Sequence, residues 1–138
     1  MAARNGTPKV ADVMTGRATS LSPESSVLEA VNLFGECGFR HVLIIDGAGD
    51  LVGVLSDRDA LRSMARTHDP ERTRVASVMT RDVVVATPEM PVASAIELLV
   101  THRINCLPVV DGARKPCGIV TTTDLLKAFR ELLGQRAN

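Results

Sequence analysis

The stretch Gly53-Val54-Leu55-Ser56-Asp57-Arg58-Asp59 sets the expectation for the fold, and Gly118–Asp124 (GIVTTTD) repeats its pattern. In each, an apolar run typical of a strand ends in a hydroxyl residue, and an aspartate follows three positions later in a helix-like segment. Such a helix start gathers a hydroxyl, a carboxylate and free backbone N–H groups, which suits a phosphate or a sugar. Ser/Thr-x-x-Asp is also the spacing of a capping box, which satisfies the helix's own backbone donors. The motif alone leaves both interpretations open.

The two stretches belong to a longer internal repeat. Sliding the sequence against itself by about 65 residues aligns it without a gap. Gly53 and Asp59 then meet Gly118 and Asp124. Further matches are Val10–Thr15 with Val75–Thr80, Pro23-Glu24 with Pro88-Glu89, and Asp46-Gly47-Ala48 with Asp111-Gly112-Ala113. Because so many separate positions agree, we interpret the chain as a duplicated unit.

Each copy predicts the order β-α-β-β-α. Apolar residues at helical spacing mark the first helix, and apolar runs bounded by Pro, Gly and Asp mark the strands. In the first copy the strands are Ala18–Leu21, Val42–Ile45 and Leu51–Leu55, the first helix buries Val27, Ala30, Val31 and Phe34, and the second is Asp57–Arg66. In the second copy the strands are Val83–Ala86, Leu107–Val110 and Cys117–Val120, the first helix buries Val92, Ala95, Ile96 and Leu99, and the second is Thr122–Leu133. Asp46 and Asp111 are expected to be turn residues.

The predicted class is therefore α+β, with two pseudo-symmetric repeats packed sheet to sheet. A unit of this size is marginal alone because one sheet face stays uncovered. We expect repeat 1 at 8–66, a polar linker without chemistry at 67–74, repeat 2 at 75–133 and a disordered tail at 134–138. Any cleft between the repeats would occur twice, and the two Ser/Thr-x-x-Asp helix starts would line these clefts.

Composition excludes several function classes. Lys+Arg and Asp+Glu both number 16, and no basic run is present, which argues against nucleic-acid binding. No apolar run approaches the length of a membrane span, so we expect a cytoplasmic protein without membrane contact. The odd set of three cysteines (Cys37, Cys106, Cys117) indicates reduced thiols, with a metal or redox role as the minority interpretation. No P-loop, nucleophile elbow or metal-ligand pair is present, so we expect no enzyme activity, required cofactor or metal site.

Taken together, the Val-Met-Thr segments, Ser/Thr-Pro-Glu before an apolar helix, Leu107–Asp111, and Gly-x-x-Ser/Thr-x-x-Asp resemble a tandem cystathionine-β-synthase (CBS) domain pair. The resemblance extends from Val10 to about Leu132 in both copies. No further domain is evident, so the chain looks like a stand-alone pair of the bacterial type. The family implies a regulatory module that binds adenosine-containing ligands between its repeats, and a homodimer.

The resemblance also implies site residues. In the family, the motif Asp holds the ribose hydroxyls, the motif Ser/Thr lies by the ribose or phosphate, and the segment after Val-Met-Thr of the other repeat borders the base. Carried over, one site has Ser56, Asp59, His41 and Arg58, with Arg81–Val84 (Val83 included) against the adenine. The other has Thr121, Asp124, Asn105 and Arg40, with Gly16–Thr19 (Ala18 and Thr19 included) against the base. His41 is equally well explained as a structural group.

The leading hypothesis is a sensor that binds AMP, ADP or ATP, with NAD and S-adenosylmethionine as alternative ligands, and signals through its homodimer to an unknown effector protein. Cys106 stands where His41 stands in the first repeat, so two unequal sites are expected. The alternative is a ligand-independent dimeric adaptor whose Ser/Thr-x-x-Asp motifs only cap helices.

Overall fold

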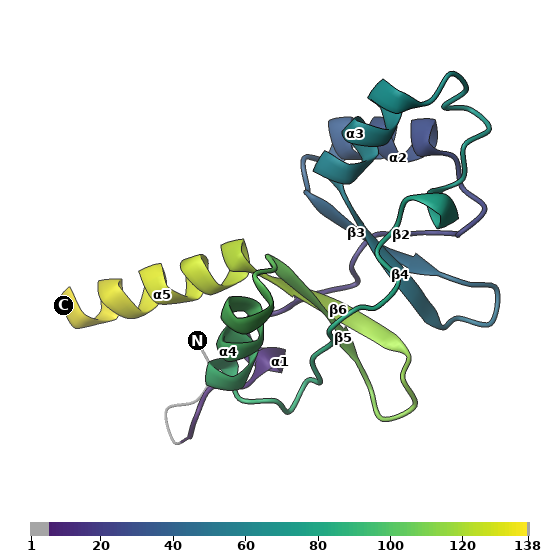
Figure 1. Ribbon diagram of the computed structural model, residues 1–138. Coiled ribbons are helices and arrows are strands. Elements are labelled where there is room, and N and C mark those ends of the chain that lie inside the picture. The colour runs from purple at the N-terminus through teal and green to yellow at the C-terminus, as the bar shows by residue number, and fades with distance from the viewer. Residues whose placement is uncertain (1–5, 138) are drawn as a thin grey trace. The chain divides into compact units, whose positions relative to one another are not determined.

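The computed structural model describes residues 6–137, which form two compact units (Figure 1). One unit is Ala18–Val83, and the other combines the chain up to Arg17 with the chain from Val84 onward. Each unit contains one three-stranded sheet and its own helices. The predicted α+β class with two β-α-β-β-α repeats is confirmed.

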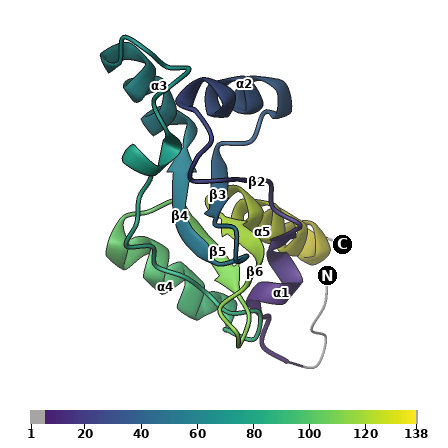
Figure 2. The same cartoon turned by 90° about the vertical axis from the view of Figure 1, so that its right-hand side faces the viewer.

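The unit Ala18–Val83 contains the sheet β2-β3-β4. Strands β2 and β3 run parallel, whereas β3 and β4 are antiparallel and place His41 opposite Ser56. Helices α2 and α3 pack side by side, as both views show (Figures 1 and 2). The elements are β2 (Ser20–Leu21), α2 (Val27–Cys37), β3 (His41–Ile45), β4 (Leu51–Ser56), α3 (Asp57–Arg66) and the 3-10 helix η1 (Val75–Ser77).

The other unit contains the sheet β1-β6-β5, in which neighbouring strands are antiparallel. Cys106 on β5 lies opposite Thr121 on β6, the same register that His41 and Ser56 have in the first unit. The elements are α1 (Val10–Val13), β1 (Thr15–Gly16), α4 (Val92–His102), β5 (Cys106–Val110), β6 (Pro116–Thr121) and α5 (Thr122–Ala137).

The compact units do not coincide with the repeats as the sequence aligns them, because the two Val-Met-Thr segments are exchanged. Thr15 pairs with Ile119, so the first Val-Met-Thr segment lies on the sheet of the second repeat. Thr80 pairs with Val54, so the second segment returns to the sheet of the first repeat. Each sheet therefore pairs with the Val-Met-Thr segment of the other copy.

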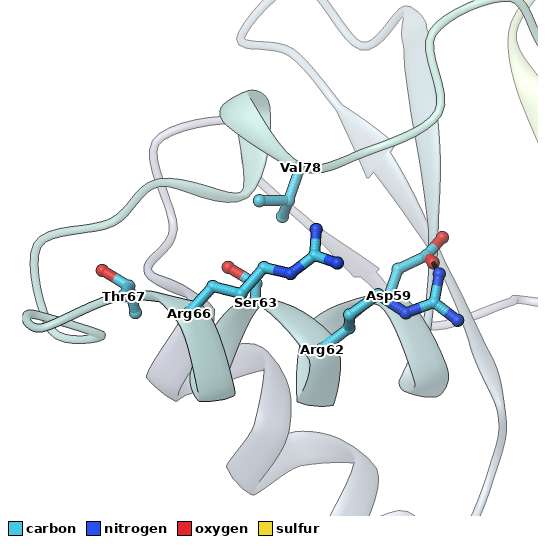
Figure 3. Close-up of a pocket in the computed structure, with 6 residues that line it drawn as sticks. All are labelled: Asp59, Arg62, Ser63, Arg66, Thr67 and Val78. Atoms are coloured by element: carbon cyan, nitrogen blue, oxygen red, sulfur yellow. Dashed lines mark ion pairs between the residues drawn. The ribbon is translucent and has the colours of Figure 1, made fainter.

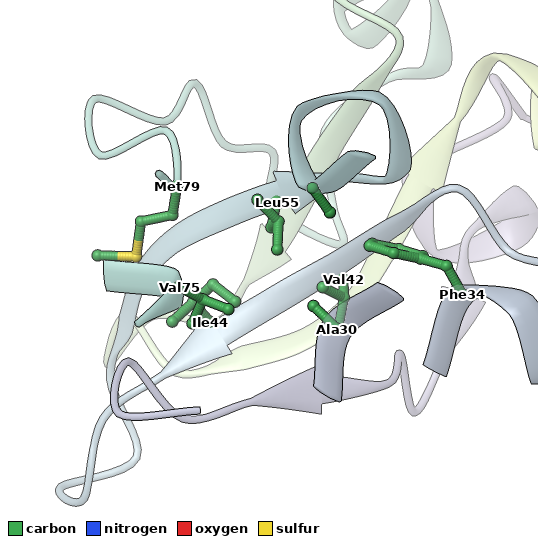
Figure 4. Packing of buried hydrophobic residues seen from close by; sticks show 8 residues of the cluster. Ala30, Phe34, Val42, Ile44, Leu55, Val75 and Met79 are labelled. Carbon is green, nitrogen blue, oxygen red and sulfur yellow. The ribbon is translucent and has the colours of Figure 1, made fainter. Parts of the chain in front are cut away.

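Each unit has its own apolar core. The first core lies between the sheet, α2, α3 and the segment after the linker, as Figure 4 shows for most of its members. Valine, isoleucine and leucine make up half of the first core and most of the second, as expected of strands that are buried on the helix side. The first core comprises Ala30, Phe34, Val42, Ile44, Leu55, Ala60, Val75 and Met79, and the second Val10, Ala86, Ala95, Leu99, Leu107, Val109 and Val120.

Local sequence explains the bounds of α2 and α4. Ser26 and Glu29 form a capping box at the start of α2, and Gly38 ends the helix at φ 76°, a conformation that glycine adopts without steric cost. Pro91 precedes α4, where its missing N–H costs nothing. Arg103 ends α4 at φ 54°, at the position that aligns with Gly38, so the second repeat has a strained residue where the first has glycine.

Four expectations need correction. The predicted strand Val83–Ala86 is reduced to one bridge, Ala86 with Val109, and Ala18–Leu21 is reduced to Ser20–Leu21. Ile96 is 43% exposed, so it does not belong to the buried face of α4 that Ala95 and Leu99 form. Residues 134–137 are not a disordered tail: they continue α5, since Gln135, Arg136 and Ala137 are good helix formers and Gly134 alone does not break a helix. Asn138 lies outside the described residues.

Asp46 and Asp111 are turn residues, as predicted, since each carboxylate accepts two backbone N–H groups of its own turn. The linker does more than connect the repeats. The carbonyls of Pro70 and Thr73 accept the N–H groups of Leu28 and Val27, which are donors at the start of α2 that the helix cannot satisfy itself. The linker therefore fixes the start of α2.

Candidate functional site

The first Ser/Thr-x-x-Asp motif lies where β4 ends at Ser56 and α3 begins at Asp57. Ser56 Oγ accepts the N–H of Asp59 at 3.1 Å and so caps the helix. His41 pairs with Ser56 across the sheet, and the Arg40 carbonyl accepts the N–H of Asp57 at 2.9 Å. The structure thus brings Arg40, His41, Ser56 and Asp59 to one corner of one unit.

The backbone donors at this corner are already in use. Asp57 N–H bonds the Arg40 carbonyl, Arg58 N–H bonds Asp57 Oδ1 at 2.7 Å, and Asp59 N–H bonds Ser56 Oγ. The expected free N–H groups for a phosphate are therefore absent from the first three residues of α3. A phosphate at this corner has to rely on cationic side chains instead.

The carboxylate of Asp59 is only lightly engaged. Its side chain is 37% exposed, and Oδ1 lies 3.7 Å from Nη1 of Arg62. It does not reach back to the backbone of Ser56, so the box is half formed. Because an ionised carboxylate offers about four acceptor positions, Asp59 keeps capacity for two hydroxyl donors.

The second motif closes its capping box completely. Oδ2 of Asp124 accepts both the backbone N–H of Thr121 at 2.9 Å and its hydroxyl at 3.0 Å. Thr121 Oγ1 accepts the N–H of Asp124 at 3.1 Å, and Thr15 donates its hydroxyl to Oδ1 at 3.0 Å. Asn105, a predicted site residue, accepts the N–H of Thr122 with its carbonyl at 2.9 Å. The capping interpretation therefore describes Asp124 better than Asp59.

The glycine that opens each motif allows the Val-Met-Thr segment to approach closely. A Cβ on Gly53 would lie 2.6 Å from Met79 Sδ and 2.8 Å from the Thr80 carbonyl. A Cβ on Gly118 would lie 2.6 Å from the Thr15 carbonyl. Sequence reasoning missed Thr15 and these contacts, although the repetition of Gly and Val-Met-Thr in both copies was the available signal.

The predicted base-bordering residues are divided between the units. Arg81–Val83 lie in the unit of Asp59, where Arg81 donates to the Ala76 carbonyl at 2.7 Å. Gly16 and Arg17 lie in the unit of Asp124, whereas Ala18, Thr19 and Arg40 lie in the unit of Asp59. Their contact with a base stays a prediction.

Burial lowers the pKa of His41 below 6.5, with Asp57 acting in the opposite sense, Arg40 lowering it further and Asp59 raising it. The imidazole is therefore mainly neutral at pH 7. A bound phosphate would favour its protonated form, because an adjacent negative charge stabilises the cation.

A hollow of about 510 Å³ lies beside Asp59, within the same unit (Figure 3). It follows α3 on the side that faces Val78. Its lining is mainly polar: Asp59, Arg62, Ser63, Arg66, Thr67 and Val78. Asp59 thus borders a hollow with an acceptor that can take ligand hydroxyls.

Other chemistry finds little support in the described part of the chain. Residues 6–137 contain no group of three or more His, Cys, Asp or Glu that could hold a metal ion. Burial raises the pKa of Cys106 to about 12, which makes this thiol a poor nucleophile and metal ligand. Within the same residues, no helix is both long and apolar enough to cross a membrane.

Comparison with known proteins places this geometry in context. The model of the CBS domain matches residues 10–66 and again 75–131. The CBS domain-containing protein YhcV of Bacillus subtilis is 35% identical over 117 residues, which are 84% of this chain and 81% of that protein. The inosine-5'-monophosphate dehydrogenase of Methanocaldococcus jannaschii is 30% identical over 119 residues, 86% of this chain. The chain spans only 23% of the length of that enzyme.

Solved structures of similar proteins have the same fold. A putative acetoin utilization protein (AcuB) of Vibrio cholerae has a TM-score of 0.85 at 29% identity, covering 95% of this chain and 96% of that one. The CBS domain pair of protein MJ0100, in complex with 5'-methylthioadenosine and S-adenosyl-L-methionine, has a TM-score of 0.82 at 26% identity and covers 91% and 98%. CBSX2 in complex with AMP has a TM-score of 0.79 at 29% identity, covering 90% of this chain and 97% of that one. Since the family model matches both halves of the sequence, the chain belongs to the CBS-domain family and carries two CBS domains.

Proposed function

We propose that this protein is a regulatory module that binds an adenosine-containing ligand at the Asp59 corner. The observation that carries the proposal is the Asp59 carboxylate, which borders a hollow and is not consumed by helix capping. CBS-domain structures similar to this chain contain AMP, or 5'-methylthioadenosine and S-adenosyl-L-methionine. The likeness supports the ligand class, and the geometry supports one of the two motifs over the other.

Each residue of the corner has a separate role in ligand binding. Two ribose hydroxyls donate to the Asp59 carboxylate, and charge-assisted bonds of this kind contribute about 1.5–3 kcal/mol each. Ser56 fixes the first turn of α3 and so the position of Asp59. Arg40, Arg58 and His41 supply positive charge or hydrogen bonds for a phosphate, and Val83 borders the base.

The Asp124 corner is the weaker site. A ribose there has to displace the hydroxyl of Thr15 or Thr121 from the carboxylate, which costs about 0.5–1.5 kcal/mol for each bond replaced. Cys106 takes the position of His41, and its buried thiol offers no charge to a phosphate. Thr121 and Asn105 complete the proposed set within this unit, and contact of Ala18 and Thr19 with a base stays a prediction from the family resemblance. AMP, ADP and ATP are the first candidates for both sites, followed by NAD and S-adenosylmethionine.

Exposed apolar residues support a homodimer. Leu61 on α3 and Leu126 on α5 occupy aligned positions and are 57% and 62% exposed. Phe129 and Leu133 extend the apolar face of α5. Such a face suits contact with a second copy. Ligand binding would shift this dimer, and an effector protein in the cytoplasm would respond to the change, so the protein acts without catalysis of its own.

The second candidate function is a ligand-independent adaptor, which the closed capping box at Asp124 favours. Isothermal titration calorimetry with AMP, ADP, ATP, NAD and S-adenosylmethionine separates the two. The sensor predicts that at least one of these ligands binds with a dissociation constant below about 1 mM, equivalent to about −4.1 kcal/mol. If none of these ligands produces heat at that concentration, the sensor is excluded and the ligand-independent adaptor remains.

A further inference from the structure

The hollow beside Asp59 extends along α3 well beyond the motif. Its α3 residues are Asp59, Arg62, Ser63 and Arg66, which recur at the i, i+3, i+4 and i+7 positions and therefore share one face of the helix. Val78, just after η1, forms the opposite wall. The volume of about 510 Å³ falls within the range of roughly 300–1,000 Å³ typical of small-molecule sites.

This face is cationic beyond Asp59. Nη1 of Arg62 lies 3.7 Å from Oδ1 of Asp59, and both side chains are partly exposed to solvent. Among residues 6–137, Arg66 has no carboxylate at ion-pair distance. The Arg66 side chain points along α3 toward Asp59, and its guanidinium lies below Val78 (Figure 3). With one carboxylate and two guanidinium groups, the charged residues of the lining sum to +1.

The second repeat provides an internal comparison. The positions of α5 that align with Arg62, Ser63, Arg66 and Thr67 hold Lys127, Ala128, Glu131 and Leu132. Both hydroxyls are lost and the second cation becomes an anion. With Asp124, the aligned charged residues sum to −1. The cationic face is therefore a property of the first repeat and not of the fold.

We propose that Arg62 and Arg66 form a subsite for an extended phosphate chain, whose sugar bonds Asp59. The proposal rests on the proposed function, since Asp59 fixes the sugar end. The backbone positions of Asp59 and Arg66 are about 10 Å apart along the helix axis at about 1.5 Å per residue, and the Arg66 side chain points back toward Asp59. A chain of several phosphoryl groups that starts beside Asp59 therefore meets both guanidinium groups, whereas a monophosphate stays near the sugar. The first site thereby prefers a nucleoside triphosphate to a monophosphate.

The chemistry of the lining suits this ligand. Guanidinium groups present several N–H donors in a plane and pair with phosphate oxygens in a bidentate manner. Ser63 adds a hydroxyl donor between them, whereas the hydroxyl of Thr67 is already paired with Thr73 Oγ1 at 2.7 Å. Because the first N–H groups of α3 already have acceptors, the backbone cannot hold the phosphates. Arg40, Arg58 and His41 can meet the phosphate nearest the sugar, and Arg62 and Arg66 are the donors along the hollow.

The test is calorimetry with ATP, AMP and inorganic tripolyphosphate, without divalent cations, on the wild type, Arg62→Gln/Arg66→Gln and Lys127→Gln/Arg130→Gln. The last variant removes the same charge from α5. We expect the first double variant to lower ATP affinity by about tenfold or more and AMP affinity by less than threefold, as expected from losing charged hydrogen bonds. The α5 variant should change the ATP-to-AMP affinity ratio by less than threefold.

The outcomes separate this subsite from the proposed function. If ATP and AMP both bind and their affinity ratio is the same in the Arg62/Arg66 variant, the subsite is wrong and the adenosine site stands. If tripolyphosphate alone binds and depends on the two arginines, the subsite stands and the adenosine site is wrong. An equal loss of ATP affinity in both double variants means a general charge effect and overturns the subsite.

Discussion

The Thr15 hydroxyl donates to Asp124 Oδ1 at 3.0 Å, although 109 positions separate the two residues in the sequence. Their aligned counterparts are Thr80 and Asp59, and among the described residues this pair makes no such bond. Asp59 instead lies 3.7 Å from Arg62. The two motifs are thus equal in sequence spacing but unequal in the acceptor capacity that their aspartates retain.

This difference predicts unequal effects of two matched substitutions. Thr15→Val removes the hydroxyl but keeps the shape, so the free energy of unfolding should fall by about 0.5–1 kcal/mol, at the low end for a hydrogen bond because the bond is solvent-exposed. Thr80→Val should change it by less than about 0.3 kcal/mol. Urea unfolding of both variants measures the difference, and equal losses would mean that the Thr15 bond contributes nothing.

Gly53 allows the Thr80 carbonyl to approach the strand. Gly53→Ala places a methyl group 2.6 Å from Met79 Sδ and 2.8 Å from that carbonyl, so strand and segment have to separate. We expect a loss of about 1–3 kcal/mol, the usual cost of overpacking a core. Gly47→Ala is the control, because nothing lies within 4 Å of its added Cβ. If thermal unfolding shows that both variants have the same fall in melting temperature, the close approach is excluded.

The three thiols should differ in reactivity. Cys37 is exposed, whereas burial raises the pKa of Cys106 to about 12 and also raises that of Cys117, together with Asp111 and Glu89. Since the thiolate is the reactive form, a thiol reagent at pH 8 should modify one group rapidly in the native protein and all three after denaturation. Cys37→Ser should remove the fast phase. A fast phase that remains in this variant would contradict the lower reactivity expected of the other two.

His41 should make stability depend on pH below about 6.5. Its pKa in the folded protein is lowered by burial, so the unfolded chain binds the proton more tightly. The contribution of His41 to stability is therefore fully present above pH 6.5 and is lost as the pH falls toward its lowered pKa in the folded protein. The stability difference between wild type and His41→Gln should shrink across that window as the pH falls. A difference that is constant from pH 7.5 to about 5 would show that His41 does not titrate differently on folding.

Much of the fold was predictable because both copies agree on it. Helix α3 has the predicted bounds, and Asp46 and Asp111 close their turns as expected. The exchange of the Val-Met-Thr segments could not be derived from the residues alone, although the family resemblance implied that each motif meets the segment of the other repeat. Val10–Thr15 and Val75–Thr80 are so similar that either could pair with either sheet, and only the path of the whole chain decides between them.

For the site, the sequence located the acidic residues but could not rank them. Asp59 and Asp124 share the same motif, but Asp124 also accepts the backbone N–H of Thr121 and a hydroxyl that the fold brings from Thr15. The cationic face of α3 was equally hidden. Arg62 and Arg66 are ordinary surface residues by spacing, and they gain interest only because η1 places Val78 opposite them.

The most direct test of the central claim compares the affinity of Asp59→Asn and Asp124→Asn for whichever adenosine ligand binds best. Asparagine keeps the size of the side chain but removes the charge that two ribose hydroxyls need. We predict that Asp59→Asn weakens the tighter binding event by about 10- to 150-fold, while Asp124→Asn leaves that event within about threefold of the wild type. Equal affinity of Asp59→Asn and wild type would contradict the account.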